Sequence, residues 1–140
     1  MQFLGIDYGT KRIGLAIGNA ETKLASPLMT VPARGNAAGD AAAVAARAGE
    51  YEVDGYVVGL PSNMDGTEGR QAKLSRAFGE ALARCTGLPV HYFDERLSSF
   101  TAKELLEPAE LSRRRRKDLL DPVAAQVMLQ QFLDEYSPPQ

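Results

Sequence analysis

Three short apolar runs precede the first helical stretch of this 140-residue chain, and their spacing limits the sheets that it can build. Residues 2–7 and 12–18 flank a Tyr-Gly-Thr turn and are rich in apolar side chains, which predicts a β-hairpin. Residues 24–31 follow a polar turn and end at Pro32, which predicts an edge strand, because proline cannot donate to a central ladder. The start of the chain therefore predicts an antiparallel meander.

Helical and strand-like segments alternate after this meander. Alanine-rich residues 36–51 predict a first helix, and the compact apolar run at residues 56–60 predicts a buried strand. Apolar positions three and four apart predict a second helix over residues 68–85, and residues 90–93 predict a last strand. Helical crossovers would make the later strands parallel to the first. We therefore expect an α/β fold with a mixed sheet flanked by helices.

The rest of the chain predicts two more helices, a short one from Ser98 to Leu106 and a last one over residues 122–136. Cys85 lies on the apolar side of the second helix and is expected in the core. His91, in the last strand, has no neighbours that suggest a nucleophile or a general base, so a structural role is expected. Residues 1–136 should form one domain, followed by a frayed tail at residues 137–140.

Composition excludes several classes of function. A formal net charge of -2 and an isoelectric point near 5.4 give no global field for nucleic acid or a membrane surface, so any basic site must be local. A single cysteine excludes an internal disulfide framework and fits a reducing compartment. No signal-like segment and no apolar run of about 18 residues is present, which predicts a soluble cytoplasmic protein.

Acidic residues follow the first and the last predicted strands. Asp7 ends the first strand, and Asp94 and Glu95 end the last, so these acids should meet where the carboxyl ends of parallel strands form one edge. On a helical wheel Asp121 shares the apolar face of the last helix. Carboxylates that share a site repel one another unless cations compensate, and oxygen ligands favour Mg²⁺ or Mn²⁺. The pattern predicts metal-assisted hydrolysis of phosphodiester bonds.

Simpler roles remain open for each acid. Asp7 could form an Asx turn before Gly9, and Asp121 followed by Pro122 could cap a helix, either alone or together with metal binding. Successive strand residues point to opposite faces, and the sequence does not decide which of two adjacent acids faces the site. Whether Asp94 or Asp118 joins the metal ligands is also left open.

One dense basic block occurs just before Asp121, in the letters RRRRK. Such a block is often only a solvated segment, but beside catalytic acids it would form a phosphate-binding patch. Cations in the first turn, at the start of the second helix and after Glu95 are weaker candidates for the same surface. The candidate nucleic-acid-binding residues are Lys11, Arg12, Arg70, Arg96, Arg113, Arg114, Arg115, Arg116 and Lys117.

Four blocks, FLGIDYGTKRIGLA, VVGLPSNMDGTEG, YFDERLSS and DPVAAQVMLQQFL, resemble those of the YqgF or RuvX family in their order and spacing. This family comprises RNase H-like Holliday junction resolvases, also described as pre-16S rRNA nucleases. The resemblance implies a five-stranded RNase H-like sheet, catalytic metal-binding carboxylates at Asp7, Glu95 and Asp121, and a divalent-metal-dependent endonuclease. Branched DNA and precursor ribosomal RNA are the implied partners. Pro122 departs from the residue usual in the family's last block.

Two other functions are weighed against this one. Actin-like kinases and ATPases begin with a similar strand, acid and glycine turn, but they clamp nucleotide between two such domains, and this chain supplies one. A non-catalytic module could keep the fold and the basic segment and bind nucleic acid only. Symmetric cutting of a DNA junction would call for a two-fold homodimer.

Overall fold

The structure, a computed structural model, describes the backbone of residues 1–61, 68–94 and 113–137, and the side chains of these residues except 113–121. Its centre is a five-stranded sheet in the order β3-β2-β1-β4-β5. β1, β2 and β3 pair antiparallel, whereas β4 is parallel to β1 and β5 to β4. The predicted mixed sheet is confirmed. Its strands are β1 Gln2–Tyr8, β2 Arg12–Asn19, β3 Leu24–Pro32, β4 Gly55–Leu60 and β5 Val90–Asp94.

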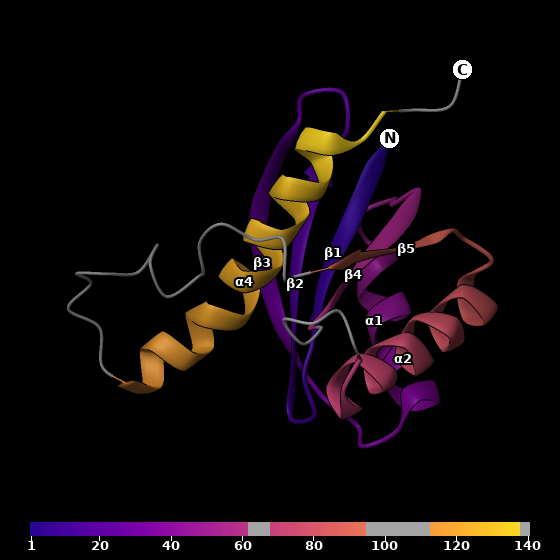
Figure 1. Ribbon diagram of the computed structural model, residues 1–140, viewed down its shortest axis with the longest axis vertical. Helices are drawn as coiled ribbons and strands as arrows, with labels where there is room; N and C mark the ends of the chain where they lie inside the picture. The colour runs from indigo at the N-terminus through magenta and orange to yellow at the C-terminus, as the bar shows by residue number, and fades with distance from the viewer. Residues whose placement is uncertain (62–67, 95–112, 138–140) are drawn as a thin grey trace.

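Among the described helices, two cover one face of the sheet and one covers the other (Figure 1). α1 (Ala37–Ala48) begins after Asn36, whose side chain accepts a hydrogen bond of 2.7 Å from the Gly39 N–H. α2 (Arg70–Thr86) ends at Gly87, which has a φ of 73°. α1 and α2 pack against each other on one face, and α4 lies over β1, β2 and β3 on the other. Within the described ranges, no helix has the length and apolarity that crossing a bilayer requires.

The last helix differs from its prediction. α4 spans Arg113–Glu135, so Pro122 lies inside the helix rather than at its start. The expected start, and the interpretation of Asp121 as an N-cap, were therefore wrong. A proline inside a helix removes one backbone hydrogen bond and is locally unfavourable. Buried residues that follow it, including Ala125 and Leu129, pack on the sheet and offset that cost.

Of three further predictions, one was wrong and two lie outside the described residues. Cys85 is exposed, so its expected place in the core was wrong. Cys85 continues the spacing of the buried residues Phe78 and Leu82, but it lies in the last turn of α2, after the last buried residue of the helix. The short helix expected from Ser98 lies outside the described residues, as does the tail after Ser137.

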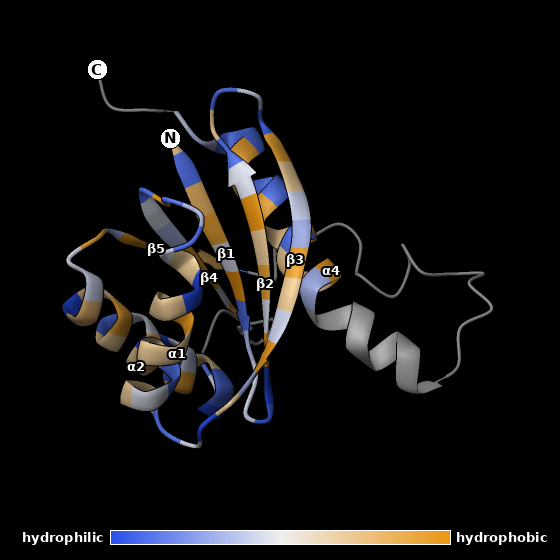
Figure 2. Ribbon diagram, turned by 180° about the vertical axis from the view of Figure 1, so that it is seen from behind, coloured by the Kyte–Doolittle hydropathy of each residue, from blue (hydrophilic) through white to orange (hydrophobic). Residues whose placement is uncertain are grey.

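The core has one layer on each side of the sheet. Even-numbered residues of β1, such as Leu4 and Ile6, pack with α1 and α2, while Phe3 packs with α4. All six residues of β4 are buried, as expected for a strand covered on both faces. Apolar residues accordingly run along the central strands (Figure 2). Strand alternation therefore assigns the odd-numbered residues of β1, Asp7 included, to the α4 face.

α4 crosses the β1–β2 hairpin at two glycines. A Cβ atom on Gly5 would lie 2.8 Å from the Leu129 Cβ and 3.3 Å from the Ala125 carbonyl oxygen. A Cβ on Gly18 would lie 2.7 Å from Leu133 Cδ1. Gly18 pairs with Phe3, so advancing along β1 corresponds to moving back along α4. The N-terminal part of α4 therefore points toward the end of β1 that carries Asp7.

Side-chain amides of α4 also cover the free edge of β3. The Ala25 N–H donates to Gln130 Oε1 at 3.0 Å, and Gln126 Nε2 donates to the Ala25 carbonyl at 3.2 Å. These bonds satisfy backbone groups of an edge strand that would otherwise face water. α4 is therefore attached to β3 by hydrogen bonds, in addition to its packing on β1 and β2.

Replacing Gly5 by alanine should destabilise the protein, because the added methyl group collides with the Leu129 Cβ and the Ala125 carbonyl. We expect a loss of about 1–3 kcal/mol in the free energy of unfolding, measured by urea denaturation. Gly49→Ala is the matched control, since Gly49 has a right-handed φ of -58° and ordinary space around its Cβ position. It should be neutral or stabilising by about 0.4–1 kcal/mol. Equal effects of the two substitutions would contradict close packing of α4 on β1.

Candidate functional site

Asp7 is half-buried near the carboxyl end of β1. On one side it is paired with Gly14 of β2. On the other side, the pairs between β1 and β4 run from Phe3 to Ile6 and stop just before it. Asp7 therefore lies where the ladder with β4 has ended, on the face covered by α4.

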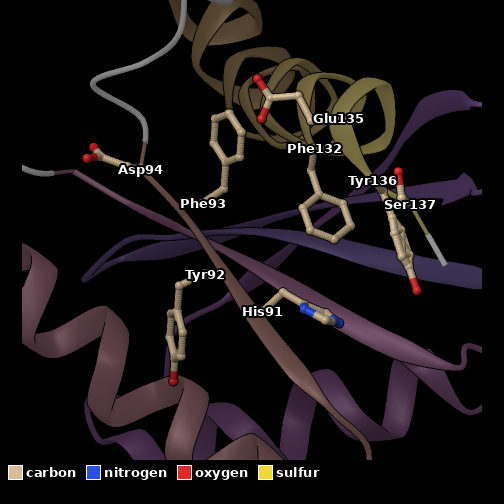
Figure 3. Close-up of a pocket in the computed structure, with 8 residues that line it drawn as sticks. All are labelled: His91, Tyr92, Phe93, Asp94, Phe132, Glu135, Tyr136 and Ser137. Atoms are coloured by element: carbon tan, nitrogen blue, oxygen red, sulfur yellow. The ribbon is translucent and has the colours of Figure 1, made fainter. Parts of the chain in front are cut away.

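The end of β5 lies on the same edge of the sheet. Tyr92 is in register with Val58 of β4, which is in register with Ile6 of β1. Phe93 points toward α4, whereas Tyr92 points toward α2 (Figure 3), where its hydroxyl donates to the Arg76 carbonyl at 3.4 Å. β5 ends at Asp94, which is half-buried. Glu95 lies outside the described residues.

Asp121 belongs to α4 by its backbone, and its side chain is not described. It precedes Ala125 by one helical turn, and Ala125 is fully buried against the sheet. Of the three predicted metal ligands, only the Asp7 side chain is therefore placed. Among the side chains that the structure describes, no three acidic, histidine or cysteine groups gather as a metal site.

A polar network that the sequence did not reveal holds the residue next to Asp7. The Tyr8 hydroxyl donates to Asp40 Oδ2, and the Tyr8 ring stacks on Phe78 with centroids 4.4 Å apart. Gln71 Nε2 donates to the Tyr8 carbonyl at 2.8 Å. The Arg34 N–H donates to the other oxygen of Asp40, Oδ1. Residues of α1, α2 and the loop before α1 thus converge on the last residue of β1.

Burial and the neighbouring carboxylate raise the pKa of Tyr8. Desolvation is the larger cause, and the hydrogen bond to Asp40 and the negative charge of Asp40 act in the same direction. One signal in the sequence could have revealed Asp40. It precedes Val44 and Ala48 by four and eight residues and so shares their buried helix face.

The candidate cations are only partly placed. Lys11 is exposed in the turn after β1, and Arg12 is the half-buried first residue of β2. Arg70 begins α2 and lines a hollow of about 230 Å³ together with Tyr8 and Thr10. Lys11 and Arg12 thus follow the end of β1 along the chain, and Arg70 lies near Tyr8 on the α1 and α2 side. Arg96 lies outside the described residues, and the side chains of residues 113–117 are not described.

His91 has the structural surroundings that were expected for it. Its ring lies 5.7 Å from the Phe3 ring and 5.3 Å from the Phe132 ring, measured between centroids. It borders a hollow of about 520 Å³ between β5 and the end of α4 (Figure 3). Phe132 and Tyr136 line the same hollow, together with the acids Asp94 and Glu135, and the ring contacts of His91 fit a packing role.

Known proteins resemble this chain along nearly its whole length. The family model described as RuvX, Holliday junction resolvase, matches residues 1–135. A protein of Anaeromyxobacter sp. (strain Fw109-5), named "Putative pre-16S rRNA nuclease", is 48% identical over 134 residues, covering 96% of this chain and 97% of the relative. A protein of Myxococcus xanthus (strain DK1622) with the same name is 45% identical over 139 residues, covering 99% and 91%.

A solved structure resembles the fold at lower identity. Thermus thermophilus RuvC in complex with Holliday junction substrate gives a TM-score of 0.50 at 19% sequence identity, covering 95% of this chain and 93% of that chain. This likeness confirms the expected RNase H-like fold.

The raised pKa of Tyr8 predicts how stability depends on alkaline pH. The unfolded chain loses the tyrosine proton near its ordinary pKa of about 10, while the folded protein retains it, so stability falls as pH rises above that value. The slope is at most about 1.4 kcal/mol per pH unit, an upper bound because Tyr8 is partly exposed. Tyr8→Phe lacks this proton and should be less stable than wild type near neutral pH.

Urea denaturation of both proteins from about pH 8 to about pH 11.5 checks this prediction, because the wild-type advantage should narrow above about pH 10. A difference that stays constant over this range would contradict the raised pKa.

Proposed function

Because the chain belongs to the RuvX family of Holliday junction resolvases, we propose that it is a divalent-metal-dependent endonuclease that hydrolyses phosphodiester bonds in structured nucleic acid. One observation carries the site assignment. Asp7 ends β1 on the face covered by α4, and α4 runs back along β1 toward it. Asp7 and the part of α4 that contains Asp121 would therefore lie toward the same end of β1.

Strand alternation supports Glu95 rather than Asp94 as the second acid. Phe93 packs on the α4 face, and residues two apart along a strand share a face. If the alternation continued one residue beyond Asp94, Glu95 would share the face on which Asp7 lies. The observed orientation of Phe93 therefore supports the proposal of Glu95 over Asp94, a choice that the sequence alone left open.

Helix geometry supports Asp121 as the third acid. It lies four residues before Ala125 and eight before Leu129, the two residues that contact the Gly5 position. Positions four apart share one helix face, so Asp121 follows the same stripe one turn farther toward the Asp7 end. Its place within α4 also means that metal binding does not compete with a capping role.

The donor set fits a hard divalent cation. Asp7, Glu95 and Asp121 supply only carboxylate oxygens, which suit Mg²⁺ or Mn²⁺ better than softer metals. When bound, such an ion would polarise the phosphoryl group and lower the pKa of a water molecule. The three residues would hold the ion at the sheet edge, and the half-buried position of Asp7 would limit competing water.

Basic residues around the same edge would bind the phosphates. Lys11, Arg12 and Arg70 border the end of β1, and we assign Arg96 and the block at residues 113–117 to the same surface. Phosphate contacts fix the position of a nucleic acid but carry little base information. Recognition should therefore depend on the shape of the substrate more than on its sequence.

Among structured nucleic acids, we propose precursor 16S rRNA as the substrate. The names of relatives that are 45–48% identical over nearly the whole chain support RNA. The RuvC structure, which holds a Holliday junction, is 19% identical. Symmetric cutting of a four-way junction would also need a two-fold dimer, whereas cutting one RNA strand needs only one copy.

A cleavage panel tests this function. Precursor 16S rRNA, four-way DNA junctions, linear duplex and single strands are incubated with the protein and Mg²⁺, Mn²⁺ or a chelator. We expect metal-dependent cleavage of the precursor RNA and none with the chelator. Asp7→Asn, Glu95→Gln and Asp121→Asn should each lower kcat by more than the roughly 10–100-fold typical for loss of an outer-shell partner.

Asp94→Asn is the matched control, because it alters the adjacent acid of the same segment and should retain most of the activity. Equal loss in Asp94→Asn and Glu95→Gln would contradict the strand alternation argument. Cleavage that persists in all three acid variants would indicate a contaminating nuclease. Binding without cleavage under every metal condition would favour the non-catalytic module, and a thermal shift with ATP would favour the actin-like alternative.

A further inference from the structure

Asp40 is a buried carboxylate that the proposed chemistry does not use. It is 1% exposed and lies in the first turn of α1. Its oxygens accept from the Tyr8 hydroxyl and the Arg34 N–H, and in the described part of the chain no lysine or arginine side chain pairs with it. Burial of a carboxylate is costly unless it is hydrogen-bonded, and the first turn of a helix also favours a negative charge. The two bonds of Asp40 join the start of α1 to the end of β1 and to the loop before the helix.

Tyr8 is the residue that Asp40 immobilises, and it is held at three points. Its ring stacks on Phe78 with an interplanar angle of 17°, its hydroxyl donates to Asp40, and its carbonyl accepts from Gln71 Nε2. These three partners come from both helices on the α1 and α2 face. Neither rotation of the side chain nor displacement of the backbone can occur without breaking one of these contacts.

These contacts lie where the strand ladder ends. β1 and β4 pair only as far as Ile6 and Val58, so Asp7 and Tyr8 extend beyond the last pair on that side. Gln71 and Asp40 provide side-chain bonds at the place where backbone pairing with β4 has stopped. The network therefore reinforces the part of β1 that pairing leaves least constrained.

We propose that Asp40 and Tyr8 are positioning residues, which hold the end of β1 from the α1 and α2 face so that the Asp7 carboxylate on the opposite face is aimed at the metal. Adjacent strand residues point to opposite faces, so a turn of the backbone at Tyr8 also turns Asp7. This inference rests on the proposed metal site. Outer-shell groups that orient a ligand commonly affect metal affinity about 10–100-fold.

The same carboxylate also fixes the turn after Asp7. Asp40 accepts from the Arg34 N–H, and the preceding Ala33 N–H donates to the Lys11 carbonyl at 2.9 Å. The Gly9 N–H donates to the Arg12 carbonyl at 3.0 Å and closes that turn. These hydrogen bonds connect Asp40 to the backbone of the turn that follows Asp7 and contains Lys11.

Two variants separate positioning from stability. Tyr8→Phe removes the hydroxyl and leaves Asp40 short of a partner, which lowers stability. The double variant Tyr8→Phe/Asp40→Leu makes both partners apolar and should recover part of that stability, since the Arg34 N–H also loses its acceptor. Gln2→Met is the matched control, because the Gln2 side chain donates to the Tyr51 carbonyl and tethers β1 at its other end.

Binding of Mn²⁺ to the protein without nucleic acid, followed by electron paramagnetic resonance of the free ion, is the first measurement. We expect the dissociation constant to rise about 10–100-fold in Tyr8→Phe and in the double variant, and to change less than about two-fold in Gln2→Met. A stable double variant that binds Mn²⁺ as tightly as wild type would overturn the inference.

Amide hydrogen exchange of the metal-free protein is the second measurement, and it does not depend on the proposed function. Amides of residues 7–9 should exchange faster in Tyr8→Phe and in the double variant, whereas Gln2→Met should leave them unchanged. Unchanged exchange at residues 7–9 would overturn the positioning role even if wild type bound no Mn²⁺. Failure of wild type to bind Mn²⁺, with the expected exchange result, would refute the metal site alone.

Discussion

Close packing of α4 on the β1–β2 hairpin is the constraint on which the arrangement of the site depends. Gly5 and Gly18 allow the helix to approach so closely that a single added Cβ would collide with Leu129 or Leu133. At this distance the helix has one direction and one register relative to β1. Along β1 from Gly5 to Asp7, α4 runs in the opposite chain direction, from Leu129 past Ala125 to Asp121. Gly5 and Gly18 thus set how the helix that carries Asp121 lies relative to the strand that carries Asp7.

The two faces of β1 would serve different functions. The α4 face would carry the acids and the metal, while on the other face Tyr8, Asp40, Gln71 and Phe78 fix the strand end. Backbone pairing with β4 stops at Ile6, so rigidity beyond it depends on side chains. Asp40 supplies such a side chain, and it joins the first turn of α1 to the end of β1.

Much of this structure could be predicted because its signals are local. Apolar runs and turn residues predicted the five strands and their antiparallel and parallel parts, and Asn36 and Gly87 marked helix ends that the structure confirms. Features that depend on contacts between distant segments could not be predicted. α4 extends nine residues before Pro122 although proline favours a helix start, and Cys85 has the spacing of the buried stripe but lies exposed in the last turn of α2. Asp40 showed helical spacing with buried alanine and valine, but its partner Tyr8 belongs to another element.

A crystal structure of the protein with Mn²⁺, with the ion located by its anomalous scattering, tests the central claim most directly. The account predicts one site at the edge of the sheet where oxygens of Asp7, Glu95 and Asp121 all coordinate the same ion or an adjacent pair, at distances of roughly 2.0–2.4 Å. Anomalous density elsewhere, or these three carboxylates on separate surfaces without a shared ion, would contradict it.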